Sequence, residues 1–98
     1  MPPTFETSSP FDRDLKVLTS QQRDRLKVAV AAFVDDLKAG RQPRPGLRIK
    51  GVQGAPGIFE ITYAPDGRAT FQYGAPVQAG EAHIVWRRVG THEILKRP

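Results

Sequence analysis

Apolar residues near the start of the chain recur at helical intervals. Phe11, Leu15 and Leu18 are separated by four and three residues, so a helix carries them on one stripe. Ser9 and Pro10 come directly before Phe11. A serine cap followed by proline at the first helical position is typical of a helix start. The pattern therefore predicts a short helix capped by Ser9.

A second, longer helical pattern follows directly. Thr19 and Gln22 have the spacing of a capping box, and Gly40 is the residue type that commonly ends a helix. Between them one face is apolar and the other positions are largely charged, with Asp35 and Asp36 expected on the exposed side. The predicted buried residues are Leu26, Val30, Phe33 and Leu37. We expect the two helices to form a hairpin.

From Ile58 onwards apolar and polar positions alternate, which is the period of a β-strand. The sequence APDG at residues 64–67 separates two such runs, so we predict a β-hairpin in which Gly67 accepts a positive φ. A further strand is predicted at residues 83–88, ended by Gly90. The opening segment PTFET is predicted to add an edge strand.

The order of these elements predicts a fold class. Residues 41–57 are rich in Pro and Gly and are expected to be a loop with a short extended piece around residues 47–52. Residues 1–98 then form a single α+β domain, a helix hairpin packed on a small twisted antiparallel sheet of three to four strands. The other sheet face is expected to meet solvent or a ligand. It carries Glu60, Thr62, Arg68, Thr70 and Gln72.

Composition narrows the class of protein. Of the 98 residues, 39% are hydrophobic and 26% are charged, as in globular domains, and no cysteine is present for a disulfide. No apolar run is long enough to span a bilayer and no signal peptide is recognisable, so we expect a cytoplasmic protein without a membrane partner. The net charge of +5 biases the surface toward polyanions such as nucleic acid or an acidic protein.

Few catalytic motifs are available. Two histidines without cysteine leave no convincing metal site, and GVQGAPG at residues 51–57 lacks the Lys-Ser/Thr and the helix of a phosphate-binding loop. The serines lie at expected helix starts, which argues against hydrolytic serine chemistry. We therefore expect neither a metal nor another cofactor.

A cationic group remains, expected on one side of the sheet: Arg68, Arg87 or Arg88, and His92. Arginine donates in a fixed fork suited to phosphate, and histidine exchanges a proton near neutral pH. This set suits metal-independent RNA cleavage, in which a 2'-hydroxyl attacks the adjacent phosphate and an acid protonates the leaving 5'-oxygen. Structural roles stay open as alternatives, because strand-end arginines are commonly solvated and a histidine after a glycine can serve as a cap.

The chain resembles the RelE/ParE toxin superfamily of bacterial toxin–antitoxin systems over residues 11–95. The resemblance rests on the helix pair, the basic connector, the hairpin GIFEITYAPDGRATFQY and the ending HIVWRRVGTHEIL. The ending is most similar to RelE- and YafQ-like mRNA interferases. The resemblance implies a RelE-like fold and an endoribonuclease that cleaves mRNA in the ribosomal A site, arrests translation and is neutralised by a cognate antitoxin protein.

Carried over residue by residue, the resemblance implies that Arg68 and Arg88 act on the scissile phosphate and that His92 is the general acid. The residues expected to position RNA are Lys50, Arg48 and Arg87. Strand alternation adds Glu60 as a base or as a residue that orients Arg68. The elements that distinguish several other members are missing, so no general base is assigned.

Two alternatives to a nuclease remain. ParE-like members of the superfamily inhibit DNA gyrase and cleave nothing, and a phage-type relative would be a protein-binding module only. The combination of Arg88 with His92 favours the nuclease. Truncated messages during growth arrest would indicate the nuclease, whereas an SOS response with intact messages would indicate a gyrase inhibitor.

Overall fold

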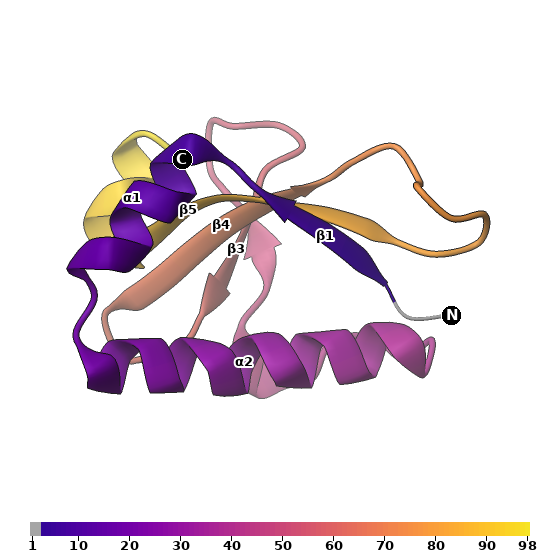
Figure 1. Ribbon diagram of the computed structural model, residues 1–98, viewed down its shortest axis with the longest axis horizontal. Coiled ribbons are helices and arrows are strands. Elements are labelled where there is room, and N and C mark those ends of the chain that lie inside the picture. Colours follow the sequence, from indigo (N-terminus) through magenta and orange to yellow (C-terminus); the bar gives the residue numbers. More distant parts are fainter. Residues whose placement is uncertain (1–2) are drawn as a thin grey trace.

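The computed structural model describes residues 3–98 and has the expected α+β arrangement, with helices packed on one sheet (Figure 1). No helix in this part of the chain has the length and apolar character needed to cross a membrane. The elements are β1 (Thr4–Thr7), α1 (Ser9–Val17), α2 (Ser20–Lys38), η1 (Pro45–Leu47), β2 (Lys50–Gly51), β3 (Phe59–Thr62), β4 (Gly67–Tyr73), β5 (His83–Thr91) and η2 (His92–Lys96), where η marks a short 3₁₀-helix.

The five-stranded sheet has the order β1-β5-β4-β3-β2. Strands β2 to β5 pair antiparallel, whereas β1 runs parallel to β5 with Thr4 opposite His83. The predicted three to four antiparallel strands are therefore too few, and the sheet is mixed. Neither edge strand carries a strong alternating pattern, because β2 has two residues and β1 has mostly exposed side chains.

Both helices begin at hydroxyl caps. The α1 cap is Ser8 rather than the predicted Ser9, because the Ser8 Oγ accepts the hydrogen bond of the Phe11 N–H. The α2 helix begins at the predicted capping box, in which Thr19 and Gln22 exchange side-chain and backbone hydrogen bonds. The helices follow each other directly, as expected, but α2 runs along one face of the sheet while α1 lies beside β5 (Figure 1).

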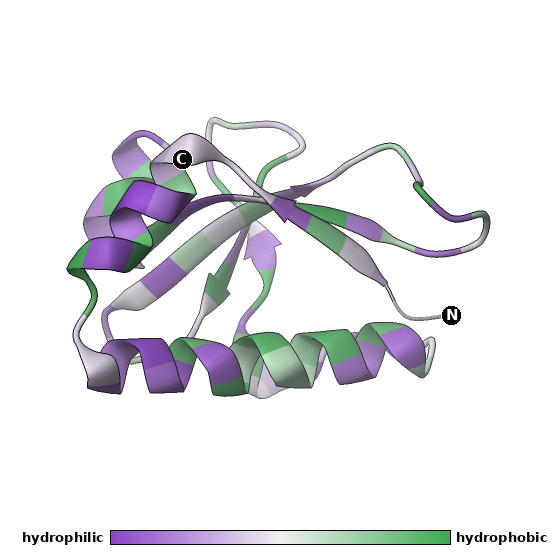
Figure 2. Cartoon of the chain, viewed as in Figure 1, coloured by the Kyte–Doolittle hydropathy of each residue, from purple (hydrophilic) through white to green (hydrophobic). Residues whose placement is uncertain are grey.

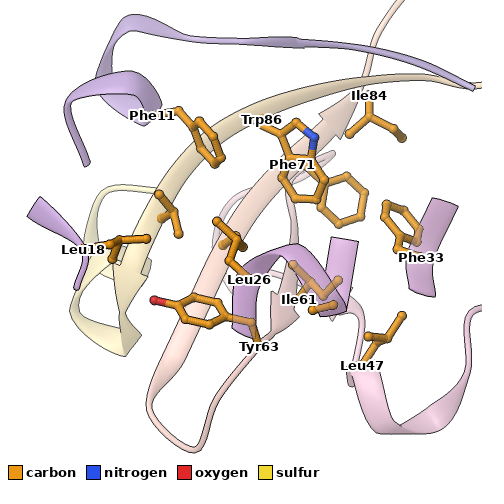
Figure 3. Close-up of a cluster of buried hydrophobic side chains, with 13 residues drawn as sticks. Phe11, Leu18, Leu26, Phe33, Leu47, Ile61, Tyr63, Phe71, Ile84 and Trp86 are labelled. Atoms are coloured by element: carbon orange, nitrogen blue, oxygen red, sulfur yellow. The ribbon is translucent and has the colours of Figure 1, made fainter. Parts of the chain in front are cut away.

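The core lies between α2 and the sheet. Trp86 packs with its ring centroid 5.4 Å from that of Phe71 and 6.0 Å from that of Phe11 on α1. Phe33 of α2 and Ile61 of β3 are completely buried beside them (Figure 3). Hydrophobic and hydrophilic residues alternate along α2 and the strands, which is how the sequence separates this core from solvent (Figure 2).

Asp36 contradicts the expectation of an exposed charge, since it is 1% exposed. Its carboxylate accepts from the Arg41 guanidinium at 2.8 Å and from both the backbone N–H and the side chain of Arg44, at 2.8 to 3.0 Å. These hydrogen bonds hold the pKa of Asp36 far below its usual value. Helical periodicity cannot foresee this burial, because the two arginines come from the connector that follows the helix.

The sheet face opposite α2, hereafter the open face, is less exposed than predicted. β5 continues through Gly90 instead of ending there, and η2 then folds back so closely that a Cβ at Gly90 would lie 3.1 Å from Ile94 Cγ2. Glu60 and Thr70 are 5% and 0% exposed. The Thr70 hydroxyl donates to the main-chain oxygen of Pro98 at 3.2 Å. Residues 92–98 therefore cover the middle of the open face.

Candidate active site

One row of side chains crosses the open face. The strand register places Lys50 opposite Glu60, Glu60 opposite Thr70, and Thr70 opposite Arg88. Directly opposed residues share a face, with Cβ atoms about 4.5–5.5 Å apart. The row thus runs from a predicted RNA-positioning lysine to a predicted catalytic arginine through a buried carboxylate and a buried hydroxyl.

The three predicted catalytic residues lie in or next to one cross-strand pair, of which Arg68 is a member. Arg68 on β4 is opposite Gly90 on β5, and Gly90 lies two positions from both Arg88 and His92. Backbone spacing then sets each of the two within about 7–8 Å of the Arg68–Gly90 pair. Within residues 3–98 the three side chains form no hydrogen bond with one another, and each is held by a different set of neighbours.

Arg68 is anchored on the β3–β4 turn. Its Nη1 donates to the carbonyls of Gly67 at 3.0 Å, Pro65 at 3.3 Å and Ala64 at 3.4 Å. Its Nε lies 3.8 Å from the Glu60 carboxylate. Nη2 has no hydrogen bond within the described residues, so this edge of the fork is free to donate to a phosphate oxygen.

Glu60 suits an orienting role better than that of a base. Its side chain is 7% exposed and lies under Arg68, between Lys50 and Thr70 of the neighbouring strands. A base must reach the proton that it removes, directly or through one water. A carboxylate buried beneath an arginine is instead placed to fix the direction of that guanidinium.

His92 contacts the Asp66 carboxylate of the β3–β4 turn through Nδ1. An ionised carboxylate only accepts hydrogen bonds, so the contact requires the proton on Nδ1. The hydrogen bond with His92 lowers the pKa of Asp66, which keeps that carboxylate ionised. The imidazole is 59% exposed and its Nε2 lies 3.5 Å from Glu93, so the second nitrogen remains accessible for proton transfer.

The turn that holds Asp66 is fixed by Tyr63 and Gly67. The Tyr63 hydroxyl donates to the Gly90 carbonyl at 2.8 Å, which ties the turn to β5. A Cβ on Gly67 would lie 2.5 Å from the Tyr63 ring. Glycine is thus required here for close approach and not for the predicted positive φ, which occurs at other glycines of the chain.

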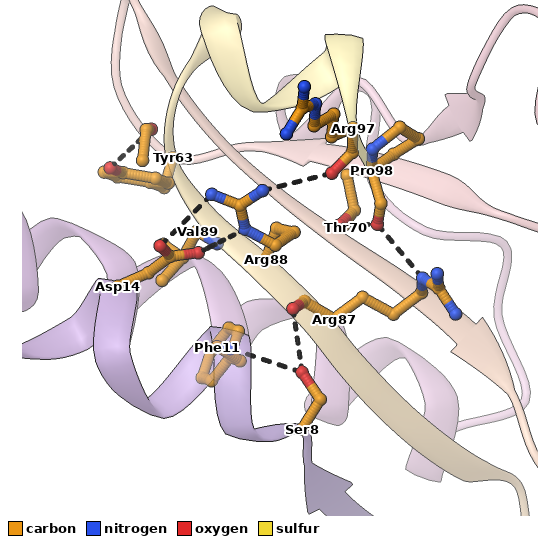
Figure 4. A network of polar contacts seen from close by, with 11 residues as sticks. Ser8, Phe11, Asp14, Tyr63, Thr70, Arg87, Arg88, Val89, Arg97 and Pro98 are labelled. Carbon is orange, nitrogen blue, oxygen red and sulfur yellow. Dashed lines mark hydrogen bonds and ion pairs between the residues drawn. The ribbon is translucent and has the colours of Figure 1, made fainter.

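Arg88 forms an ion pair that the sequence did not reveal. Its Nε donates to Asp14 of α1 at 2.7 Å, and the same carboxylate oxygen accepts from the Val89 N–H at 3.1 Å (Figure 4). Asp14 raises the pKa of Arg88 through this hydrogen bond. The contact ties α1 to β5 and neutralises the guanidinium that is predicted to meet the phosphate.

A β-bulge turns two consecutive arginines to the same side. Thr70 pairs with Arg88 but Phe71 pairs with Trp86, so Arg87 is the additional residue on β5. Its guanidinium donates to the main-chain oxygen of Pro98 at 3.0 Å and to Gln72 at 2.6 Å, while Arg88 reaches the Arg97 carbonyl (Figure 4). Simple alternation would have sent one of the two arginines into the core.

The remaining predicted residues lie at the far edge of the sheet. Lys50 on β2 and Arg48 before it line a separate hollow with Phe59 and Tyr73. Strands β3 and β4 lie between β2 and β5, so the backbones of Lys50 and Arg88 at the two ends of the row are about 14 Å apart. Lys50 joins the row across the sheet, whereas Arg48 stands outside it. Within residues 3–98 no group of three or more His, Cys, Asp or Glu side chains is arranged to hold a metal ion.

Two site residues were missed from the sequence, Asp14 and Asp66, whereas Thr70 was placed on the correct sheet face without its burial or its contact with Pro98. Asp66 lies in a turn signal that was recognised, but its partner follows a strand 26 residues away. The available clue was the hairpin register, which brings this turn beside the end of the next strand. Asp14 gave no such signal, because its contact with β5 spans 74 residues.

Comparison with known proteins supports the predicted fold. No protein-family model and no curated protein matches the sequence. Among solved structures, YafQ in the DinJ–YafQ toxin–antitoxin complex of E. coli matches with a TM-score of 0.68 and 18% identity, covering 97% of this chain and 98% of YafQ. A chain of the RelB–RelE antitoxin–toxin complex from Methanococcus jannaschii matches with a TM-score of 0.59, 19% identity and coverage of 92% and 93%.

A third match is the conserved hypothetical protein HP0892 from Helicobacter pylori, with a TM-score of 0.58 and 28% identity over 95% of this chain and 98% of that one. The chain therefore has the fold of the RelE and YafQ toxins, and the structural resemblance expected from the sequence is confirmed. At these identities the likeness establishes the fold, and the roles of individual residues rest on the geometry described above.

Proposed function

We propose that this protein is the toxin of a toxin–antitoxin system and cleaves mRNA in the ribosomal A site without a metal. The observation that carries the proposal is the strand register, in which Arg68 is opposite Gly90 and the backbones of Arg88 and His92 are each two positions from Gly90. The fold shared with RelE and YafQ supports it. The bias of a +5 chain toward polyanions agrees with an RNA substrate, and the proposed action on ribosomes places the protein in the cytoplasm.

In the proposed reaction the 2'-oxygen forms a bond to the adjacent phosphorus and the bond from phosphorus to the 5'-oxygen breaks. The products are a 2',3'-cyclic phosphate and a 5'-hydroxyl. Arg68 and Arg88 donate to the phosphate oxygens, on which negative charge increases in the transition state. As the general acid, His92 gives its Nε2 proton to the 5'-oxygen, while Asp66 holds Nδ1. The 2'-hydroxyl proton leaves to water or to a base that this chain does not assign.

An antitoxin partner is proposed as well, and an apolar groove between α1, α2 and β1 suits it. The groove has a volume of about 630 Å³ and includes the exposed ring of Phe5 and part of Trp86. Lys16, Arg23 and Lys27 lie at its margin. An amphipathic segment with an apolar face and acidic flanks would bury the rings and pair with these cations. The DinJ–YafQ and RelB–RelE structures that match this chain are complexes of a toxin with its antitoxin.

One observation favours a second candidate, a toxin that inhibits DNA gyrase or a module that only binds protein. The Arg88–Asp14 ion pair occupies the arginine that the nuclease needs at the phosphate. A protein that never cleaves RNA has no use for a free guanidinium at this position. The nuclease requires instead that phosphate compete with Asp14 for Arg88.

Induced expression separates the two candidates. Wild-type protein and the His92→Gln and Arg68→Gln variants are expressed in bacteria, and message ends and the SOS response are followed during growth arrest. The nuclease predicts arrest with messages cut at ribosomal A-site codons for wild type and continued growth for both variants. Arrest with intact messages and an SOS response would support the gyrase inhibitor and reject the nuclease.

A further inference from the structure

Four arginines line one hollow on the side of the open face next to α1. The hollow has a volume of about 460 Å³, and its cationic lining consists of Arg13, Arg87, Arg88 and Arg97. Asp14 is the one acidic side chain among its lining residues in the described chain, and it is already paired with Arg88. The side chains of Arg13 and Arg97 make no hydrogen bond or ion pair within residues 3–98. Positive charge therefore exceeds negative charge in this hollow.

The donors in the hollow converge on oxygen atoms of the chain itself (Figure 4). Arg87 Nε and the Thr70 hydroxyl both donate to the Pro98 main-chain oxygen, at 3.0 and 3.2 Å, and Arg88 Nη1 donates to the Arg97 carbonyl at 3.1 Å. Thr70 is completely buried, and its hydrogen bond to Pro98 fixes the direction of its hydroxyl. Two guanidinium groups and a hydroxyl arranged in this way match the donors that a phosphate group accepts from.

We infer that this hollow is a second phosphodiester subsite, which binds the phosphate neighbouring the scissile one when the main-chain oxygens of Arg97 and Pro98 turn away and the Arg97 side chain stays at the hollow. The inference rests on the proposed function for the position of the scissile phosphate. Thr70 and Arg68 lie two residues apart on the same face of β4, about 7 Å, which is comparable to the spacing of successive phosphates along a nucleic acid strand. Arg88 lies opposite Thr70 in this hollow and two residues from Gly90, which is opposite Arg68, so it borders both sites.

The subsite assigns a role to arginines that the cleavage chemistry does not use. Arg13 and Arg97 extend from α1 and from the end of the described chain toward the same hollow. A phosphodiester would replace the Arg97 carbonyl that now faces Arg88 by an anionic oxygen, which adds an ion pair to that hydrogen bond. The strand would then be held at two successive phosphates, which fixes the scissile one against Arg68 and His92.

The test is binding of a labelled oligodeoxynucleotide, which has no 2'-hydroxyl and cannot be cleaved by the proposed reaction. Fluorescence anisotropy at several salt concentrations compares wild type with the Arg13→Gln/Arg97→Gln double variant. Loss of a phosphate contact should weaken binding and reduce the slope of log K against log salt by about 0.7. The control is Lys38→Gln, compared with Arg13→Gln alone, because Lys38→Gln removes equal charge from the end of α2 on the other face and should leave a steeper slope than the arginine variant.

Equal slopes for the arginine variant and its control, or absence of binding by wild type, would overturn the subsite. A parallel titration with inorganic phosphate is followed by the amide NMR signals of Thr70 and Gln72. If these signals move with phosphate and not with the oligonucleotide, the hollow binds free phosphate and the phosphodiester subsite is rejected. The probe is not cleaved, so the binding test is independent of the nuclease activity. A smaller salt slope for the arginine variant than for its control, together with uncut messages in the expression experiment, would retain the subsite and reject the nuclease. Cut messages together with equal salt slopes would retain the nuclease and reject the subsite.

Discussion

The Asp66 carboxylate and the His92 imidazole meet where the β3–β4 turn lies against the end of β5. The contact joins a turn residue to the first residue of η2, and it fixes the protonated nitrogen of the imidazole. Both side chains are 59% exposed, so the pair lies at the surface rather than in the core. An exposed histidine held by a carboxylate at the edge of a cationic sheet face has the position that a proton donor to a ligand bound there requires.

The pKa of Asp66 provides a direct check of this pair. It lies below its usual value of 3.8, chiefly because of the hydrogen bond with His92. Replacing His92 by Gln removes a cationic partner of the ionised form, so the pKa of Asp66 should rise. The measurement is a pH titration of the carboxyl carbon by NMR. Lys96→Gln is the control, since it should raise the pKa of Glu93 and leave Asp66 largely unchanged.

Asp14→Asn should separate the structural and catalytic roles of Arg88. Loss of the charge-assisted hydrogen bonds between α1 and β5 should lower the free energy of unfolding by about 1–2 kcal/mol, measured by denaturant unfolding. The same change frees Arg88 for phosphate, so the affinity for an oligonucleotide should rise. A variant that is less stable and binds no more tightly would show that Arg88 does not meet the ligand.

Asp36→Asn should lower the melting temperature by at least about 5 °C at neutral pH, because Arg41 and Arg44 lose their shared charged acceptor. The folded pKa of Asp36 is depressed below 3.8, so its contribution is fully present above that value and declines as the pH falls below it. The difference from wild type should therefore be constant above about pH 5 and shrink in acid. The exposed neighbour Asp35, changed to Asn, should cause little loss at any pH.

Gly67→Ala should destabilise the fold and impair cleavage together. The new methyl group would lie 2.5 Å from the Tyr63 ring, and that ring cannot retreat easily because it is buried and hydrogen-bonded to Gly90. The expected loss is about 1–3 kcal/mol in thermal or denaturant unfolding. Gly46→Ala is the matched control, since nothing lies within 4 Å of its Cβ position. Equal stability of the two variants would mean that the turn tolerates a displacement of Tyr63.

Local sequence signals predicted the parts of this fold whose partners are close in the chain. The capping box of Thr19 and Gln22 marked the start of α2, and alternation assigned Ile61 and Phe71 to the core side of the hairpin. The same alternation placed Arg68 and Glu60 together on the opposite side. Each of these features depends on residues within one helix or one hairpin, where spacing alone determines which side chains share a face.

The features that complete the site depend on distant segments and were not predictable in this way. The bulge beside Arg87 breaks the period of two, and its position is set by pairing with β4 rather than by the sequence of β5 itself. The burial of Asp36 requires arginines from the connector, and that of Thr70 requires residues 92–98 to fold over the sheet. No local pattern records such contacts, because they form only when separate elements pack.

The central claim, that guanidinium groups and His92 cleave RNA, is tested most directly by a reconstituted assay. Purified wild type, His92→Gln and Arg68→Gln are each mixed with ribosomes carrying a defined message, and the ends of the products are identified. We predict A-site cuts with 2',3'-cyclic phosphate and 5'-hydroxyl ends for wild type, and a rate about 10²- to 10⁴-fold lower for His92→Gln. An intact message with wild type, or equal rates for all three proteins, would contradict the claim.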